Sequence, residues 1–210
     1  MKHAFAKYEF NLYSESQLDG WLSKCGMKLS QPKAIAEAIL ALSDIYNGAK
    51  GSPDIWSKNN FVGAYLAYFM PLNYLRCRYV LNQYEVKASK VVDYGAGIGA
   101  FTFAILKDGE LKNTDWPSIV AIEPSGSARK WMEVLLRDLR IPPSKVSVVS
   151  QLAPQSPLKE SALLFSYSLN EMGELPSFAT QANELVISEP SLKDVARRLQ
   201  ALRPSLQTSG

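Results

Sequence analysis

The chain has 210 residues, 47% of them hydrophobic and 20% charged, and a formal net charge of +3. These values are typical of a globular protein with room for one full α/β domain and a small additional unit, and they exclude a strongly basic nucleic-acid-binding domain. The two cysteines lack metal-ligand spacing and His3 is the single histidine, which argues against a metal site and against a Ser-His-Asp triad.

The sequence carries no signal for a membrane or for secretion. No apolar run reaches the about 18 residues of a membrane span, and the first residues lack the apolar core of a signal peptide. Cys25 and Cys77 are best explained as free thiols of a reducing compartment. We therefore expect a cytoplasmic protein that binds neither a membrane nor a metal.

Residues 1–86 are predicted to form an N-terminal helical unit. Ser14 and Gln17 form a capping pattern at the start of the first helix, and Pro32 suits the first turn of the second. The helices that we expect here cover residues 14–25, 32–47 and 57–84, the last with a break near Pro71.

Residues 87–210 alternate between short apolar runs and amphipathic segments. The strands that we expect cover residues 90–94, 118–123, 145–149, 161–167 and 184–189. The expected helices cover residues 99–108, 126–140, 176–183 and 191–202. This strand–helix–strand order predicts an α/β fold of the Rossmann-like kind, a parallel sheet with helices on both faces.

A glycine-rich run joins the first expected strand to its helix. Residues 91–99 read V-V-D-Y-G-A-G-I-G, with glycines at alternate positions. Glycines at such a turn let the backbone approach a ligand closely, and the helix that follows offers its N-terminus. For the glycines alone, a tight turn in an ordinary α/β protein remains the alternative.

Glu123 adds a carboxylate at the end of the second expected strand. A carboxylate in this place can hold the hydroxyl groups of a ribose, in nicotinamide dinucleotides and in S-adenosylmethionine (SAM) alike. The dinucleotide fingerprint is G-x-G-x-x-G, whereas Gly95, Gly97 and Gly99 give G-x-G-x-G.

Asp93, two residues before the first glycine, distinguishes the two cofactors better. The run from Asp93 to Gly99 resembles the first motif of class I SAM-dependent methyltransferases, an acidic residue, any residue, then G-x-G-x-G. A carboxylate suits the cationic amino-acid head of SAM and would repel a pyrophosphate. The residues that we expect to bind SAM are Asp93, Tyr94, Gly95, Ala96, Gly97, Glu123, Pro124, Gln151 and Leu152.

The same resemblance implies a seven-stranded sheet, of which the sequence accounts for five strands. We therefore expect either a truncated chain or a short variant of the fold. Asn170 and Glu171 follow the fourth strand, whose end faces the ligand crevice, and are the candidate catalytic residues. The alternative is that Asn170 caps the next turn and that Glu171 is solvated.

The stretch 65–84 is rich in aromatic residues and contains Arg76 and Arg78. One interpretation is a surface that stacks on bases or covers SAM, with the mildly basic helix 126–140 contributing to RNA binding. The other is a helical cap packed on the sheet, with helix 126–140 simply solvated.

Residues 64–74, which read A-Y-L-A-Y-F-M-P-L-N-Y, carry a narrower resemblance. They resemble the methyltransferase-like proteins associated with the small ribosomal subunit in bacteria and mitochondria. Further matches are Glu123-Pro124-Ser125, Leu169-Asn170-Glu171, Glu189-Pro190 and Arg197 or Arg198. The resemblance covers about residues 55–200 and implies SAM as cofactor and ribosomal RNA, or the small subunit itself, as partner.

Two departures from that family stand out. Phe69 occupies the place of the usual arginine two residues before the proline, and no cysteine follows Cys77 to ligate an iron–sulfur cluster. A methyltransferase acting on ribosomal RNA is our leading hypothesis. The alternatives are a non-catalytic ribosome-assembly factor, a small-molecule methyltransferase and, with least support, a nicotinamide oxidoreductase.

Overall fold

Five parallel strands form the centre of the molecule. The computed structural model describes residues 10–48, 54–112, 117–152, 158–172, 174–189 and 193–207, without the side chains of residues 111–112, 170–171, 193–194 and 203–207. The strands are β1 (Lys90–Tyr94), β2 (Ser118–Ile122), β3 (Val146–Val149), β4 (Ser161–Ser166) and β5 (Glu184–Ser188). Their order is β3-β2-β1-β4-β5 and every neighbouring pair is parallel, which confirms the predicted Rossmann-like α/β fold.

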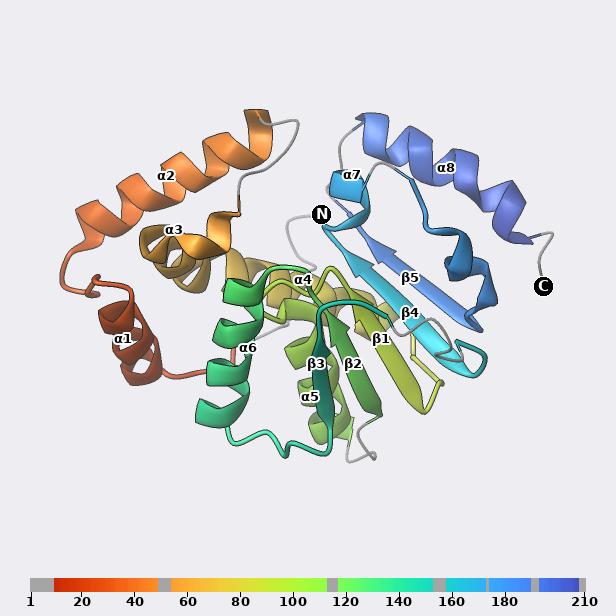
Figure 1. The fold of residues 1–210 in the computed structure, drawn as a ribbon, viewed down its shortest axis with the longest axis horizontal. Helices are drawn as coiled ribbons and strands as arrows, with labels where there is room; N and C mark the ends of the chain where they lie inside the picture. The colour runs from red at the N-terminus through yellow and green to blue at the C-terminus, as the bar shows by residue number, and fades with distance from the viewer. Residues whose placement is uncertain are drawn as a thin grey trace.

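Helices cover both faces of this sheet. The α-helices are α1 (Glu15–Lys24), α2 (Pro32–Gly48), α3 (Asn59–Ala64), α4 (Met70–Gln83), α5 (Ala100–Lys112), α6 (Gly126–Asp138), α7 (Leu169–Met172) and α8 (Lys193–Gln207). Figure 1 shows β3 and β5 at opposite edges, with α6 beside β3, α8 beside β5, and α1 to α3 gathered on the far side of α6.

The predicted helix starts are confirmed by their caps. Ser14 is the N-cap of α1: its N–H donates to Gln17 Oε1 at 2.9 Å, and its Oγ accepts from the Gln17 N–H at 3.2 Å. Gly26, with a φ of +75°, follows the end of this helix, as a terminating glycine does. The second helix begins at Pro32 and ends at Gly48.

The predicted break near Pro71 takes the form of a π-helical turn, η3 (Tyr65–Phe69), between α3 and α4. Pro71 lies in the first turn of α4, where backbone N–H groups have no partner within the helix, so the lack of an N–H in proline costs α4 nothing. In a π-helix each N–H bonds to the carbonyl five residues earlier, so an N–H at position 71 would have bonded to the carbonyl of Leu66. The hydroxyl of Tyr13 donates to that carbonyl instead, at 2.6 Å.

Three helical expectations differ from the structure. The predicted helix 176–183 is a 3-10 turn, η4 (Ser177–Gln181), because the chain must return to the sheet, where the Asn183 N–H donates to the Ser161 carbonyl at 3.1 Å. The final helix, predicted over 191–202, runs to Gln207, and Leu199 and Leu202 hold it against the sheet. Helix α5 also continues to Lys112 rather than ending at residue 108.

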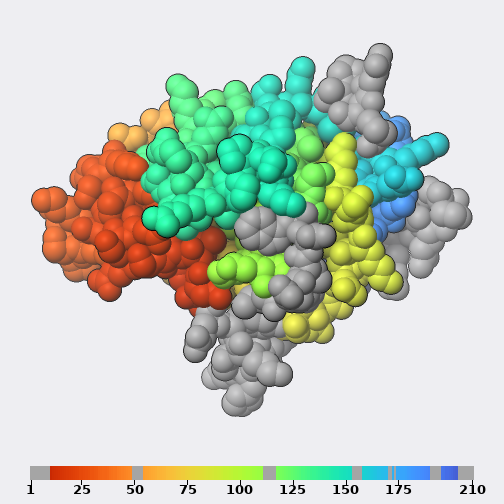
Figure 2. Space-filling view, turned by 90° about the horizontal axis from the view of Figure 1, so that it is seen from below, coloured from red at the N-terminus to blue at the C-terminus, as the bar shows by residue number. Residues whose placement is uncertain are grey.

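One hydrophobic core joins the N-terminal helices to the sheet across residue 86. It contains Trp21 and Leu42, from α1 and α2, together with Val91 and Phe101 from β1 and α5. Trp21 Nε1 also donates to Asp138 Oδ2 on α6 at 2.9 Å. Figure 2 shows α1 (red) directly against the segment from α6 to β3 (teal).

The aromatic stretch 65–84 belongs largely to this core. Tyr65 and Tyr74 are buried, and only Tyr68 and Tyr84 are exposed among its aromatic side chains, at 48% and 44%. Packing of α4 on the sheet therefore accounts for most of the aromatic residues that the sequence also allowed as a base-stacking surface. On η3, Tyr68 is the aromatic residue whose side chain is exposed to solvent.

Candidate functional site

The glycine turn after β1 has the backbone that the sequence predicted. Gly95 and Gly97 have φ values of +72° and +55°, a region that side chains with a Cβ rarely adopt. A Cβ on Gly95 would lie 2.5 Å from Ser168 Cβ, so this position also permits the close approach of the segment after β4. The N–H groups of Gly95 and Ala96 donate to the Ile122 carbonyl, which ties the turn to β2.

Glu123 lies directly beside this turn, at the carboxyl end of β2. Its Oε2 accepts from the Gly97 N–H at 2.8 Å and its Oε1 from the Ser125 N–H at 2.7 Å. The side chain is 7% exposed, and burial raises its pKa, against the two N–H donors that favour the charged form. The tips of β1 and β2 therefore meet at a carboxylate.

The residues after Glu123 begin α6 and fix the chain around this carboxylate. Ser125 is the N-cap of α6, and its hydroxyl accepts from the Ala128 N–H at 3.3 Å. Arg129 Nη1 donates to the carbonyls of Glu123 and Pro124, at 2.6 and 2.7 Å. The carbonyl of Pro124 thus helps to hold the Arg129 side chain in place, whereas the proline itself is exposed.

A segment from the N-terminal helical part of the chain closes over the turn. Asp54 caps the short turn η2 (Ile55–Ser57), and its Oδ1 accepts from the Ser125 hydroxyl at 3.0 Å. This bond places Trp56 on the glycine turn, with its ring 3.2 Å from where a Cβ of Gly97 would lie. The Trp56 ring also meets the buried Tyr65 edge-on, at 4.9 Å between ring centroids. Sequence reasoning missed Asp54 and Trp56, because nothing local connects them to the glycines.

Asp93 lies beneath the turn rather than on its surface. The carboxyl is 1% exposed, and its Oδ2 accepts from the N–H and hydroxyl of Thr102, at 3.1 and 2.7 Å. Burial raises its pKa to about 6, against the two bonds from Thr102. Asp93 Oδ1 is buried without a hydrogen-bond partner among the described residues. The residue therefore anchors the first turn of α5 and retains one unused acceptor.

The carboxyl end of β4 is the third part of the site. Tyr167 has a φ of +59°, a strained value for a tyrosine, and its N–H donates to the Ser188 carbonyl on β5 at 2.8 Å. The Ser168 hydroxyl donates to the Tyr94 carbonyl at 2.8 Å, which joins the ends of β4 and β1. The guanidinium of Arg76, on α4, lies 5.5 Å from the centroid of the Tyr167 ring.

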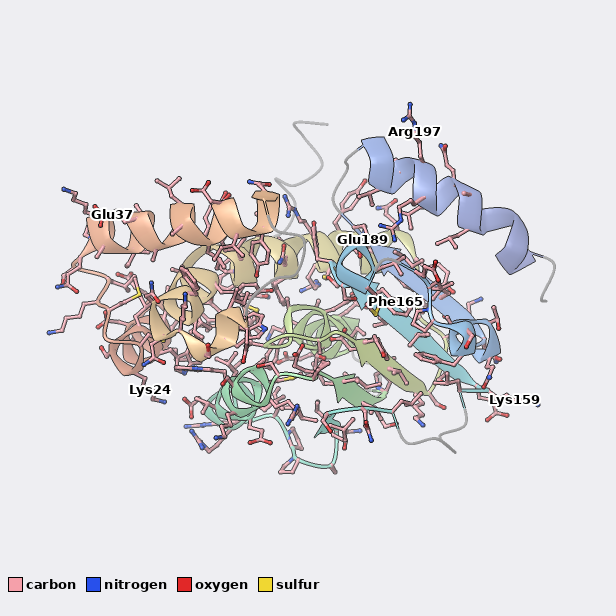
Figure 3. All side chains as sticks on the ribbon, turned by 45° about the horizontal axis from the view of Figure 1, so that its top comes forward. Lys24, Glu37, Lys159, Phe165, Glu189 and Arg197 are labelled. Atoms are coloured by element: carbon pink, nitrogen blue, oxygen red, sulfur yellow. The ribbon has the colours of Figure 1, made fainter. Side chains whose placement is uncertain are left out.

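Glu189 holds the short helix that follows. Its Oε1 accepts from the Leu169 N–H at 2.8 Å, at the start of α7. Figure 3 shows Glu189 at the end of β5, near Phe165 of β4, whereas Arg197 points away from the sheet. The backbone of Asn170 and Glu171 belongs to α7, but their side chains lie outside the described part of the structure.

The remaining predicted residues frame the same edge of the sheet. The Tyr94 ring packs against Phe165 and Phe178, so only its backbone faces the turn. Gln151 and Leu152 follow β3; Gln151 is exposed, and Leu152 packs against the hydrophobic cluster on the face of the sheet that carries α8. The structure thus brings the glycine turn and Glu123 together and places Gln151 and Leu152 at the end of a neighbouring strand.

Two other kinds of site have no candidate among the described residues. No group of three or more metal-ligating side chains comes together among them. Within the same ranges, no helix is both long enough and apolar enough to cross a membrane. In comparisons with known proteins, no family model matches the chain, and no curated protein matches it either.

This edge of the sheet carries groups of the kinds that contact nucleosides. The glycine turn is half-buried, Glu123 carries two acceptor oxygens of the kind that bind a diol, and the Trp56 ring lies against Gly97. In the ligand-free arrangement the Gly97 and Ser125 N–H groups satisfy the Glu123 carboxylate. A ribose would have to share or replace these two bonds.

Proposed function

We propose that the chain binds SAM at the glycine turn and transfers its methyl group to an acceptor. The observation that supports this most is the bond between Glu123 Oε2 and the Gly97 N–H, at 2.8 Å. It joins the two motifs, the glycine turn and the acidic strand tip, on which recognition of a ribose depends. A parallel α/β sheet alone serves many activities, so the proposal rests on these residues.

Electrostatics favours SAM over a dinucleotide in this proposal. Asp93 keeps an unused carboxylate oxygen under the turn, and Glu123 lies beside it. Two acidic groups favour the ammonium and sulfonium charges of SAM and disfavour the two negative charges of a pyrophosphate. With a pKa of about 6, Asp93 is mostly ionised at neutral pH.

For the acceptor, we propose ribosomal RNA of the small subunit, in the cytoplasm. The support is the resemblance of residues 64–74 and of the three motifs that follow the strands. Asn170 and Glu171 are proposed to align an acceptor nitrogen or oxygen with the methyl group, because α7 begins at the end of β4. Such alignment can supply a large part of the rate of a methyl transfer.

One observation favours a second candidate, a non-catalytic assembly factor that keeps the fold. The Trp56 ring already covers Gly97, 3.2 Å from the position that a Cβ of this glycine would take. If Trp56 occupies the glycine turn permanently, the turn cannot bind SAM and serves only as a rigid part of a protein that docks on the ribosome.

Transfer of tritium from labelled SAM separates the two candidates. The purified chain would be offered small-subunit particles, naked small-subunit RNA and a panel of small molecules. Label in the RNA would support the enzyme if Asn170→Ala abolishes it and Glu37→Gln does not. Glu37 is the control because its side chain is exposed on α2. Binding to particles without label would support the assembly factor, and label only in a small molecule would overturn the RNA acceptor.

A further inference from the structure

A cavity of about 490 Å³ lies between the end of α6 and the edge strand β3. Most of its lining is apolar, from Leu136, Ile141, Pro142, Pro143, Val146 and Val148. None of these residues belongs to the candidate SAM site, so a ligand of this cavity would be independent of the proposed function. Figure 2 shows the segment from α6 to β3 at the surface of the molecule.

The cavity runs along backbone groups of β3 that the described sheet leaves unpaired. The carbonyls of Lys145 and Val149 accept from β2, at 2.8 and 3.0 Å. In a parallel strand, alternate residues direct their N–H and C=O groups to opposite sides. Those of Val146 and Val148 therefore point outward, where no described strand pairs with β3.

The end of α6 places an arginine at the rim in an unusual backbone conformation. The Arg140 N–H donates to the Arg137 carbonyl and the Ile141 N–H to the Leu136 carbonyl, at 3.0 and 2.9 Å. This is a Schellman motif, in which the position of Arg140 is usually glycine. Arg140 has a φ of +58°, so a side chain is kept there at a cost in stability.

The charge of the rim is positive. Arg137 and Arg140 line the cavity together with one acidic residue, Glu133. Because Arg137 Nε is already paired with Asp138 Oδ1 at 3.3 Å, Arg140 is the arginine of the rim that has no ion pair among the described residues. We propose that this cavity and the edge of β3 bind an extended, acidic segment of a partner protein. The segment adds as a strand along Val146 and Val148, inserts an apolar side chain into the cavity and places a carboxylate near Arg140.

A peptide fits these features better than RNA does. The lining residues include no aromatic ring on which a base could stack, and apart from Arg137 and Arg140 on the rim they offer nothing to a phosphate. Unpaired N–H and C=O groups in alternation are the requirement for strand addition.

The test uses the full chain labelled with nitrogen-15 and a capped pentapeptide, Glu-Val-Leu-Val-Glu. We expect the peptide to shift the amide signals of Val146 and Val148, and a Lys-Val-Leu-Val-Lys peptide to bind at least fivefold more weakly. Methylation of the central peptide nitrogens should abolish binding, because it removes the donors needed for strand addition without altering the protein.

Two substitutions in the protein complete the test. Arg140→Gly should raise the melting temperature, since glycine suits this φ. The same substitution should lower the affinity for the acidic peptide three- to tenfold. Val148→Pro removes an outward N–H and should abolish binding, whereas Val148→Ala trims the side chain, keeps the N–H and should only weaken it.

Several outcomes would overturn the proposal. They are no shift at 1 mM peptide, shifts confined to residues away from β3, equal affinity for the acidic and basic peptides, or unchanged binding in Arg140→Gly. A single-stranded RNA that shifts Val146 and Val148 when the peptide does not would indicate a nucleic-acid surface. Concentration-dependent dimers with β3 in their interface would indicate a second copy of the chain as the occupant.

Discussion

Trp56, from the N-terminal helical part of the chain, and Gly97, from the turn after β1, lie in direct contact. The tryptophan ring is 3.2 Å from the position that a Cβ of Gly97 would take. The bond between the Asp54 carboxylate and the Ser125 hydroxyl fixes this arrangement from the other side. A ligand that binds on the glycine turn must therefore contact Trp56 or move it.

Trp56 should accordingly report the binding of SAM. We expect SAM to change the tryptophan fluorescence of the wild-type chain and of Trp131→Phe, which removes a ring on α6. The change should disappear in Trp56→Phe. A signal that persists in Trp56→Phe would place the ligand away from the glycine turn.

Substitution of Glu123 should lower the affinity for SAM while the chain stays folded. A hydrogen bond to a charged group contributes about 1.5–3 kcal/mol, so Glu123→Ala should lower the affinity about ten- to a hundredfold. Calorimetry measures the affinity, and circular dichroism checks that the fold persists. If the dissociation constant were unchanged, the ribose contact would lie elsewhere, with Ser125 as the next candidate.

The glycine turn should tolerate no side chain at Gly95. Gly95→Ala places a Cβ 2.5 Å from Ser168 Cβ at a φ of +72°, and we expect a loss of about 2 kcal/mol or more in the free energy of unfolding. Gly20→Ala is the matched control, because Gly20 lies in α1 with no atom within 4 Å of the added Cβ. It should raise stability by about 0.5–1 kcal/mol. Equal effects of the two substitutions in urea denaturation would contradict the observed turn.

Asp93 should make the stability of the wild-type chain depend on pH. Its pKa rises from an ordinary value of 3.8 to about 6 on folding, so the protonated form is favoured in the folded state. The stability from this group is fully present below pH 3.8 and is lost as the pH rises through about 6. The difference between these pKa values corresponds to about 3 kcal/mol.

Comparison with Asp93→Asn isolates this effect, because asparagine does not titrate. Between pH 3.5 and 7.5 the free energy of unfolding of the variant should gain about 3 kcal/mol relative to wild type. Chemical denaturation at several pH values measures it. A difference that stays constant with pH would show that the Asp93 carboxyl titrates alike in the folded and unfolded chain.

The sequence predicted the elements whose signals are local. The capping pair Ser14 and Gln17, the opening proline of α2 and the five apolar strand segments each act within a few residues of their own position, so their structures were predictable. The three glycines of the turn after β1, Gly95, Gly97 and Gly99, all have positive φ and belong to the same class, because their spacing reflects a backbone requirement.

What the sequence could not predict depends on contacts between distant segments. Asp93 is buried because β1 lies between β2 and β4 and is covered by α5, and the place of Trp56 depends on a bond between Asp54 and Ser125. Likewise, η4 is too short to be a helix because the chain rejoins the sheet at Asn183. Periodicity carries no information about such tertiary constraints.

Calorimetric titration of the purified chain with SAM and, separately, with NAD tests the central claim most directly. The account predicts binding of SAM, weakened at least tenfold by Glu123→Ala and unchanged by Glu37→Gln, and no measurable binding of NAD. Micromolar binding of NAD without binding of SAM would contradict it.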